Sequence, residues 1–144
     1  FGILGNKETC CGSEIRRMGE AGLFEMLVEE NMKNFSKVDP RVIVTTSPHC
    51  MNALKNEYEG LTTDVLHYSQ FVWELLSSEK LDLKTPVPMK VTYHDPCFLG
   101  KQNGVFDEPR WVIEKIPAVE FTEFGRCREN SLCCEGGGGR MWTE

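Results

Sequence analysis

Six of the seven cysteines of this 144-residue chain fall into an ordered pattern. The pair Cys10-Cys11 is followed, after the 35 residues 12–46, by Ser47-Pro48-His49-Cys50. Cys97 is followed, after the 35 residues 98–132, by the pair Cys133-Cys134. Two adjacent cysteines and a third cysteine at a repeated distance can supply several thiolates to one site. This pattern is the first candidate for chemistry.

Adjacent cysteines are poorly suited to a disulfide with each other, because the bond would strain the geometry that disulfides prefer. They can bind neighbouring metals of one cluster, since thiolates are soft ligands that suit iron–sulfur units. Gly12 follows the first pair, and Gly136 to Gly139 follow the second pair after Glu135. Glycine lets backbone N–H groups approach sulfur closely. The alternative is that these cysteines are only small buried apolar residues.

Composition favours metal or redox chemistry over a disulfide scaffold. A secreted scaffold is usually smaller and has an even number of cysteines, whereas clustered cytosolic cysteines more often bind metal or do redox work. The formal net charge of −6 argues against nucleic acid as a partner, since phosphate binding needs a basic face. The sequence has no apolar run long enough for a membrane span and no signal peptide. We therefore expect a cytoplasmic protein.

The remaining sequence alternates between the two kinds of secondary structure. Continuous or alternating apolar residues predict strands at 41–46, 90–93 and 119–124, and helical spacing predicts helices at 13–35, 51–58, 68–76 and 107–116. Alternation of this kind predicts an α/β fold with a mostly parallel sheet flanked by helices. Cys50 and Cys97 each follow a predicted strand, where the sites of such sheets form.

The motifs resemble those of the cysteine-rich CCG-domain family. The segments that carry the resemblance are Thr9-Cys10-Cys11-Gly12, Thr46-Ser47-Pro48-His49-Cys50, Tyr93-His94-Asp95-Pro96-Cys97-Phe98-Leu99-Gly100 and Glu129-Asn130-Ser131-Leu132-Cys133-Cys134. That family includes the B-type and D-type subunits of heterodisulfide reductase and the iron–sulfur subunit of glycolate oxidase. The most similar subgroup serves electron-transfer flavoprotein and quinone. The resemblance covers nearly the whole chain.

The resemblance implies two pseudo-repeated cysteine-rich units, residues 1–84 and 85–144, each only part of a complete unit. We expect a fragment, whose absent ligands belong to flanking sequence or to another chain. Ser47 stands where the first unit should have a cysteine, and Glu135 stands where glycine should follow the second pair. Cys127 matches no motif position.

The resemblance also implies a cofactor, a 4Fe–4S cluster of the non-cubane type. Its implied ligands are Cys10, Cys11 and Cys50 in the first unit and Cys97, Cys133 and Cys134 in the second. Gly136, Gly137 and Gly138 are expected to tune its potential through backbone N–H groups. The implied function is electron relay from a flavin-type or ferredoxin-type donor to a disulfide or quinone. The implied partners are a flavoprotein, a ferredoxin-like domain and a membrane quinone-linked subunit, which would hold the chain at the cytoplasmic face of the membrane.

Two other functions stay open on the sequence. The first is a structural or docking domain of a redox complex, either free of metal or holding zinc at the weakened first site. The second is a metal-free thiol–disulfide enzyme. His49 and His94 precede motif cysteines, and each either supports a thiolate or only caps a loop. Trp73, Trp111 and Trp142 are expected in the core or at an interface rather than as cofactor stacks.

Overall fold

A computed structural model of the chain describes residues 1–140, so Trp142 lies outside the described part. A short 3₁₀ helix, η1 (Gly5–Lys7), precedes α1 (Ser13–Arg17) and α2 (Ala21–Val38). The single helix predicted over 13–35 is thus wrong. The chain turns at Gly19, whose φ of +89° is left-handed and ends α1. The turn redirects the chain so that Phe24 of α2 becomes buried.

Strand β1 (Val42–Thr45) confirms the strand predicted at 41–46 and pairs in parallel with β2 (Asp64–His67), with Val42 opposite Asp64. Helix α3 (Pro48–Asn56) connects them. It starts earlier than predicted because Ser47 caps it and Pro48 occupies its first turn. Strand β2 was not predicted, since its four residues carry too short an alternation to stand out.

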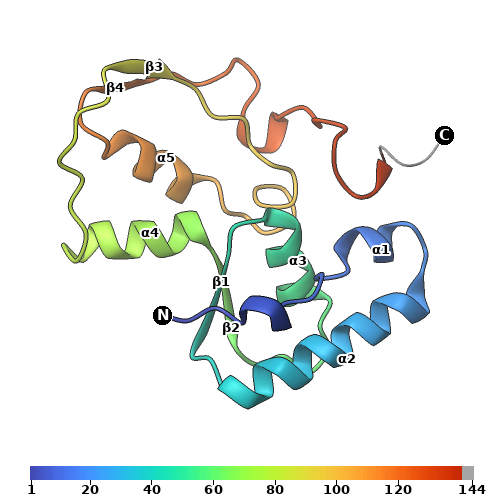
Figure 1. Cartoon of the computed structure of the whole chain (residues 1–144). Helices are drawn as coiled ribbons and strands as arrows, with labels where there is room; N and C mark the ends of the chain where they lie inside the picture. Colours follow the sequence, from blue (N-terminus) through green and yellow to red (C-terminus); the bar gives the residue numbers. More distant parts are fainter. Residues whose placement is uncertain (141–144) are drawn as a thin grey trace.

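The second half of the chain supplies another parallel pair. Helix α4 (Tyr68–Ser77) leads towards β3 (Met89–Val91), which pairs with β4 (Val119–Phe121) across α5 (Asp107–Glu114). A last 3₁₀ helix, η2, spans Arg128–Asn130. Helices α4 and α5 pack side by side, and the C-terminal segment runs back towards α1 (Figure 1). The fold is α/β as predicted, with its strands in two short parallel sheets flanked by helices.

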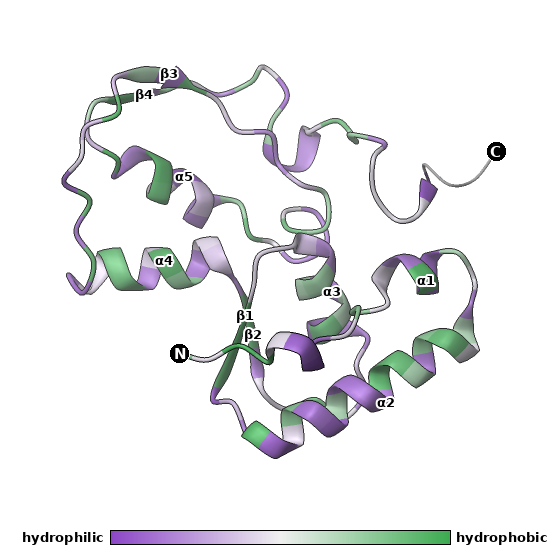
Figure 2. Ribbon diagram, in the orientation of Figure 1, coloured by the Kyte–Doolittle hydropathy of each residue, from purple (hydrophilic) through white to green (hydrophobic). Residues whose placement is uncertain are grey.

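The core lies around α3 and draws residues from both halves of the chain. Figure 2 shows α2 with hydrophobic and hydrophilic residues alternating along its length, as expected for a helix with one buried face. Met51 of α3 and Leu99 are both fully buried. Because Leu99 lies two residues after Cys97, the turn that carries this cysteine is part of the core. Its members are Phe24, Met51, Ala53, Leu54, Tyr58, Val65, Leu99 and Val105.

A buried ion pair fixes the end of β3. Asp95 is 1% exposed, and both of its carboxylate oxygens accept bonds from Arg110 of α5, at 2.7 and 2.8 Å. Arg110 also donates to Glu123, at 2.5 and 3.0 Å. Burial alone would raise the pKa of Asp95, but the hydrogen bonds from Arg110 and from the Arg128 amide hold that pKa below its usual range. Asp95 therefore stays ionised in the interior.

Among residues 1–140, no helix combines the length and the apolar character that a membrane crossing requires.

Replacing Asp95 with asparagine should lower the free energy of unfolding by about 3 kcal/mol, because it removes the buried carboxylate partner of a buried guanidinium and leaves only the partly exposed Glu123. Urea denaturation measures the change. Lys90→Met is the matched control, since it breaks the exposed Lys90–Glu120 pair and should cost less than about 1 kcal/mol. Equal effects of the two substitutions would show that the Asp95 pair does not hold the fold.

Candidate cysteine site

The first cysteine pair lies in a turn just before α1. The Gly12 amide donates to Cys10 Sγ at 3.4 Å, and Gly12 has a left-handed φ of +75°. A Cβ at Gly12 would stand 2.7 Å from the Phe24 ring. Glycine is needed here both for the backbone conformation and for the close approach of α2. The turn aims a backbone N–H at a cysteine sulfur.

Cys50 lies in the first turn of α3, beside Cys11. Ser47 Oγ accepts the Cys50 amide at 3.5 Å, so this serine caps the helix. The hydrogen bond between the two thiols, together with burial, raises the pKa of Cys11. The same hydrogen bond lowers the pKa of Cys50 to about 6, against the opposing effect of burial. The hydrogen bond between Cys11 and Cys50 therefore favours a thiolate at this contact.

The surroundings of Tyr58 indicate that the three sulfurs of the first unit lie in one region. Burial is the main reason that its pKa is raised to about 12, and the nearby Cys11, Cys10 and Cys50 raise it further. Its hydroxyl donates to the Cys11 carbonyl at 3.1 Å. Asn31 of α2 donates to the Cys10 carbonyl at 3.0 Å. A side chain from α2 and one from the segment just after α3 thus hold the backbone of the cysteine pair.

The second cysteine pair repeats the turn of the first. The Glu135 amide donates to Cys133 Sγ at 3.4 Å, and Glu135 has a left-handed φ of +57°. Glu135 therefore adopts the conformation that Gly12 adopts in the first unit, at the steric cost that a side chain brings to it. The left-handed φ and the N–H bond to sulfur are thus kept although glutamate stands where the first unit has glycine.

The structure brings Cys10, Cys11 and Cys50 together, but it leaves the second set more open. Cys97 is half-buried in the turn after β3, whereas Cys133 and Cys134 are exposed. No contact described between residues 1 and 140 joins the Cys97 sulfur to either of them. Within the same residues, no three His, Cys, Asp or Glu side chains converge closely enough to hold a metal ion as they stand.

The glycine run packs against the first unit. A Cβ at Gly137 would stand 2.6 Å from the His49 ring, and one at Gly139 would stand 2.8 Å from Met18. The His49 ring lies 4.3 Å from the Phe98 ring, centroid to centroid. His49 therefore fills the space between the glycine run and the residue after Cys97. This packing role of Gly137 was missed, because nothing in the sequence links residues 49 and 137.

The two histidines that precede motif cysteines differ in their surroundings. His49 Nδ1 is buried and has no hydrogen-bond partner among the described residues, and burial lowers the pKa of His49. His94 is exposed, and its Nε2 donates to the Leu132 carbonyl at 3.0 Å. Neither forms a described hydrogen bond with a thiol.

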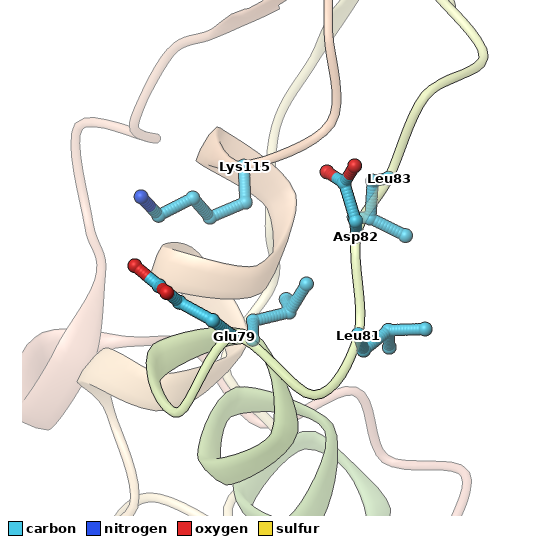
Figure 3. A pocket seen from close by; sticks show the side chains of 6 residues that line it. Glu79, Leu81, Asp82, Leu83 and Lys115 are labelled. Carbon is cyan, nitrogen blue, oxygen red and sulfur yellow. The ribbon is translucent and has the colours of Figure 1, made fainter.

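The remaining candidates lie away from the cysteine turns. Trp73 of α4 packs against Trp111 of α5 with 5.0 Å between centroids, with Trp73 half-buried and Trp111 exposed at the surface. Cys127 precedes η2 and its carbonyl accepts the Asn130 amide. A hollow of about 380 Å³ opens beside the ends of α4 and α5, with Glu79 and Lys115 at its wall (Figure 3). None of the seven cysteines lines it.

Fold and site together define a cysteine-rich α/β domain with two cysteine-pair turns. The family model described as "Cysteine-rich domain" (CCG) matches the chain twice, at residues 2–55 and 91–144. Because these matches cover more than half of the chain, it belongs to the CCG family of cysteine-rich domains. The resemblance noted in the sequence is confirmed.

Curated proteins also match the chain. It is 43% identical to the probable iron-sulfur-binding oxidoreductase FadF of Bacillus subtilis, covering 100% of this chain and 21% of that protein. It is 42% identical to the EtfAB:quinone oxidoreductase of Syntrophomonas wolfei, covering 100% and 20%. It is 34% identical to the D-type subunit of the dihydromethanophenazine:CoB–CoM heterodisulfide reductase of Methanosarcina barkeri, covering 96% and 36%. The chain thus spans about a fifth of the first two relatives. No solved structure matches it.

Replacing Gly137 with alanine should detach the glycine run from His49, because the added methyl group overlaps the ring. Hydrogen–deuterium exchange of amides 136–140 should become faster. Gly125→Ala is the matched control, since a Cβ there meets nothing within 4 Å. Adding His49→Ala to Gly137→Ala should restore slow exchange. Unchanged exchange in Gly137→Ala would rule out the packing.

Proposed function

We propose that this chain is an iron–sulfur electron-transfer domain. The proposed ligands are Cys10, Cys11 and Cys50 in one set and Cys97, Cys133 and Cys134 in the other. The observation that carries the proposal is the turn shared by the two cysteine pairs. In each, the amide two residues after the first cysteine donates to its sulfur at 3.4 Å.

The donor groups fit an iron–sulfur cofactor chemically. Thiolates are the ligands that such clusters take, and backbone N–H groups that donate to the sulfurs help to set the potential. The lowered pKa of Cys50 favours the deprotonated form that a ligand must have. Bound to these residues, a 4Fe–4S cluster of the non-cubane type would supply one-electron transfer. The thiols would close further around it, since no three of the described side chains converge as they stand.

The role of Ser47 bears on the first set. Its hydroxyl accepts the Cys50 amide and so caps α3, and its hydrogen bond to the Cys50 side chain also helps to lower the pKa of that thiol. The first set therefore offers three thiols without a fourth sulfur from this position. Further ligands would come from sequence beyond this chain or from a partner.

The partners proposed follow from the relatives. One relative is named an EtfAB:quinone oxidoreductase and another belongs to a heterodisulfide reductase. We infer that this domain receives electrons from a flavoprotein or a ferredoxin-like domain. It would pass them towards a quinone-linked membrane subunit or a disulfide, on the cytoplasmic side.

Anaerobic reconstitution of the chain with iron and sulfide tests the proposal. We expect bound iron and sulfide in similar amounts and an EPR signal in one oxidation state. Cys50→Ser and Cys133→Ser should each lower the iron content, whereas Cys127→Ser, the matched control, should leave it unchanged.

A colourless product without bound iron would contradict the proposal. Elemental analysis of the chain as isolated adds a second criterion. Zinc without iron would instead favour a structural or docking domain.

A further inference from the structure

Three hydrogen bonds join the turn that carries Cys97 to the segment that leads into Cys133. Asp95 accepts the Arg128 amide at 2.7 Å. Lys101 Nζ donates to the Ser131 carbonyl at 2.6 Å, and His94 Nε2 donates to the Leu132 carbonyl at 3.0 Å. All three bonds come from side chains of residues 94–101 and reach backbone atoms of residues 128–132. They therefore fix the course of the receiving backbone whatever its side chains are.

The three bonds lie close to the cysteines at both ends. The bonding side chains flank Cys97 on both sides, and the two carbonyls that accept bonds belong to the two residues before Cys133. The bond from His94 ends on the residue adjacent to the pair. A shift of the receiving segment by one residue would break all three bonds together. The bonds thus set the register of the second pair against Cys97.

The Cys97 turn is the rigid member of this arrangement. Leu99 is fully buried, and the Asp95 carboxylate is fixed by Arg110. Asn103 donates to the Phe98 carbonyl at 2.6 Å and to Asn52 of α3 at 3.1 Å. In contrast, the stretch from Leu132 to Gly136, which carries the second cysteine pair, is exposed. The rigid turn therefore fixes the position of an exposed, irregular segment of the chain.

The first unit holds its pair in an equivalent way. Asn31 and Tyr58 donate to the carbonyls of Cys10 and Cys11. In the second unit, the carbonyls that accept such bonds belong to Ser131 and Leu132, just before the pair. Holding a cysteine pair through backbone carbonyls leaves its sulfurs free for ligands.

We propose that His94 and Lys101 are positioning residues that bring Cys133 and Cys134 into one ligand set with Cys97. The proposal rests on the proposed function in one respect, that these three cysteines act together as ligands. Its new element is that His94 and Lys101 hold the cysteines in position. Neither side chain needs to touch the bound group, because both act on the backbone carbonyls of Ser131 and Leu132.

Cadmium binding tests this without any iron–sulfur cluster. Cd²⁺ is a soft ion that prefers thiolates, and its binding gives an ultraviolet thiolate-to-metal absorption. The reference is the full chain with Cys10, Cys11, Cys50 and Cys127 replaced by serine, which leaves Cys97, Cys133 and Cys134 as its cysteines. His94→Leu and Lys101→Met should each weaken Cd²⁺ binding about fivefold, the effect of losing one hydrogen bond. The two substitutions together should weaken it further.

His94→Gln separates positioning from direct coordination. The glutamine amide can donate where Nε2 of the histidine does but is a poor Cd²⁺ ligand, so binding should return towards the reference. Lys90→Met, which removes an exposed lysine that pairs with Glu120, should leave binding unchanged. Thermal unfolding should shift little in His94→Leu, because the side chain is exposed.

Equal Cd²⁺ affinity in all variants would overturn the proposal, and so would a His94→Gln variant as weak as His94→Leu. If the variants of the reference bind Cd²⁺ in the expected order but the unsubstituted chain takes up no iron, the positioning role is upheld. In that case the proposed function alone would fail.

Discussion

A carboxylate that is 1% exposed can stay charged only if a cation meets it, and Arg110 meets Asp95 through both of its oxygens. Most of the second unit depends on this pair. Asp95 lies in the segment after β3, and Arg110 belongs to α5. The Arg128 amide, which belongs to the segment beyond β4, also donates to Asp95. The ion pair and the Arg128 amide bond therefore tie two separate stretches of chain, α5 and the segment beyond β4, to the turn that carries Cys97.

The same turn reaches into the first unit. Leu99 enters the core around α3, Phe98 packs on His49, and Asn103 bonds to Asn52. The glycine run after the second pair also packs on His49. The two cysteine-rich units are consequently parts of one packed body. His49 is adjacent to Cys50 in the sequence and packs against Phe98 and Gly137. A change at either cysteine set would therefore alter the packing around His49.

The sequence allowed the cysteine pattern, the family and the main elements to be predicted, because each depends on residues close together or on a strong period. Strand β1 and helix α5 are examples. It could not predict β2, whose four residues form a strand only because β1 lies beside them. Nor could it predict that Arg110 meets Asp95 or that Gly137 meets His49, because those contacts depend on the folded arrangement. The role of Ser47 as a helix cap was visible in principle, since serine before proline is a common helix start.

The two cysteine turns are alike although one is followed by glycine and the other by glutamate. The backbone conformation and the N–H bond to sulfur are common to both, and they are what a thiolate ligand needs. The central claim is that cysteine sulfur from these turns binds iron. Iron K-edge X-ray absorption of the reconstituted chain tests it most directly. A first shell of sulfur with a second shell of iron is the predicted result, and a first shell of oxygen and nitrogen would contradict it.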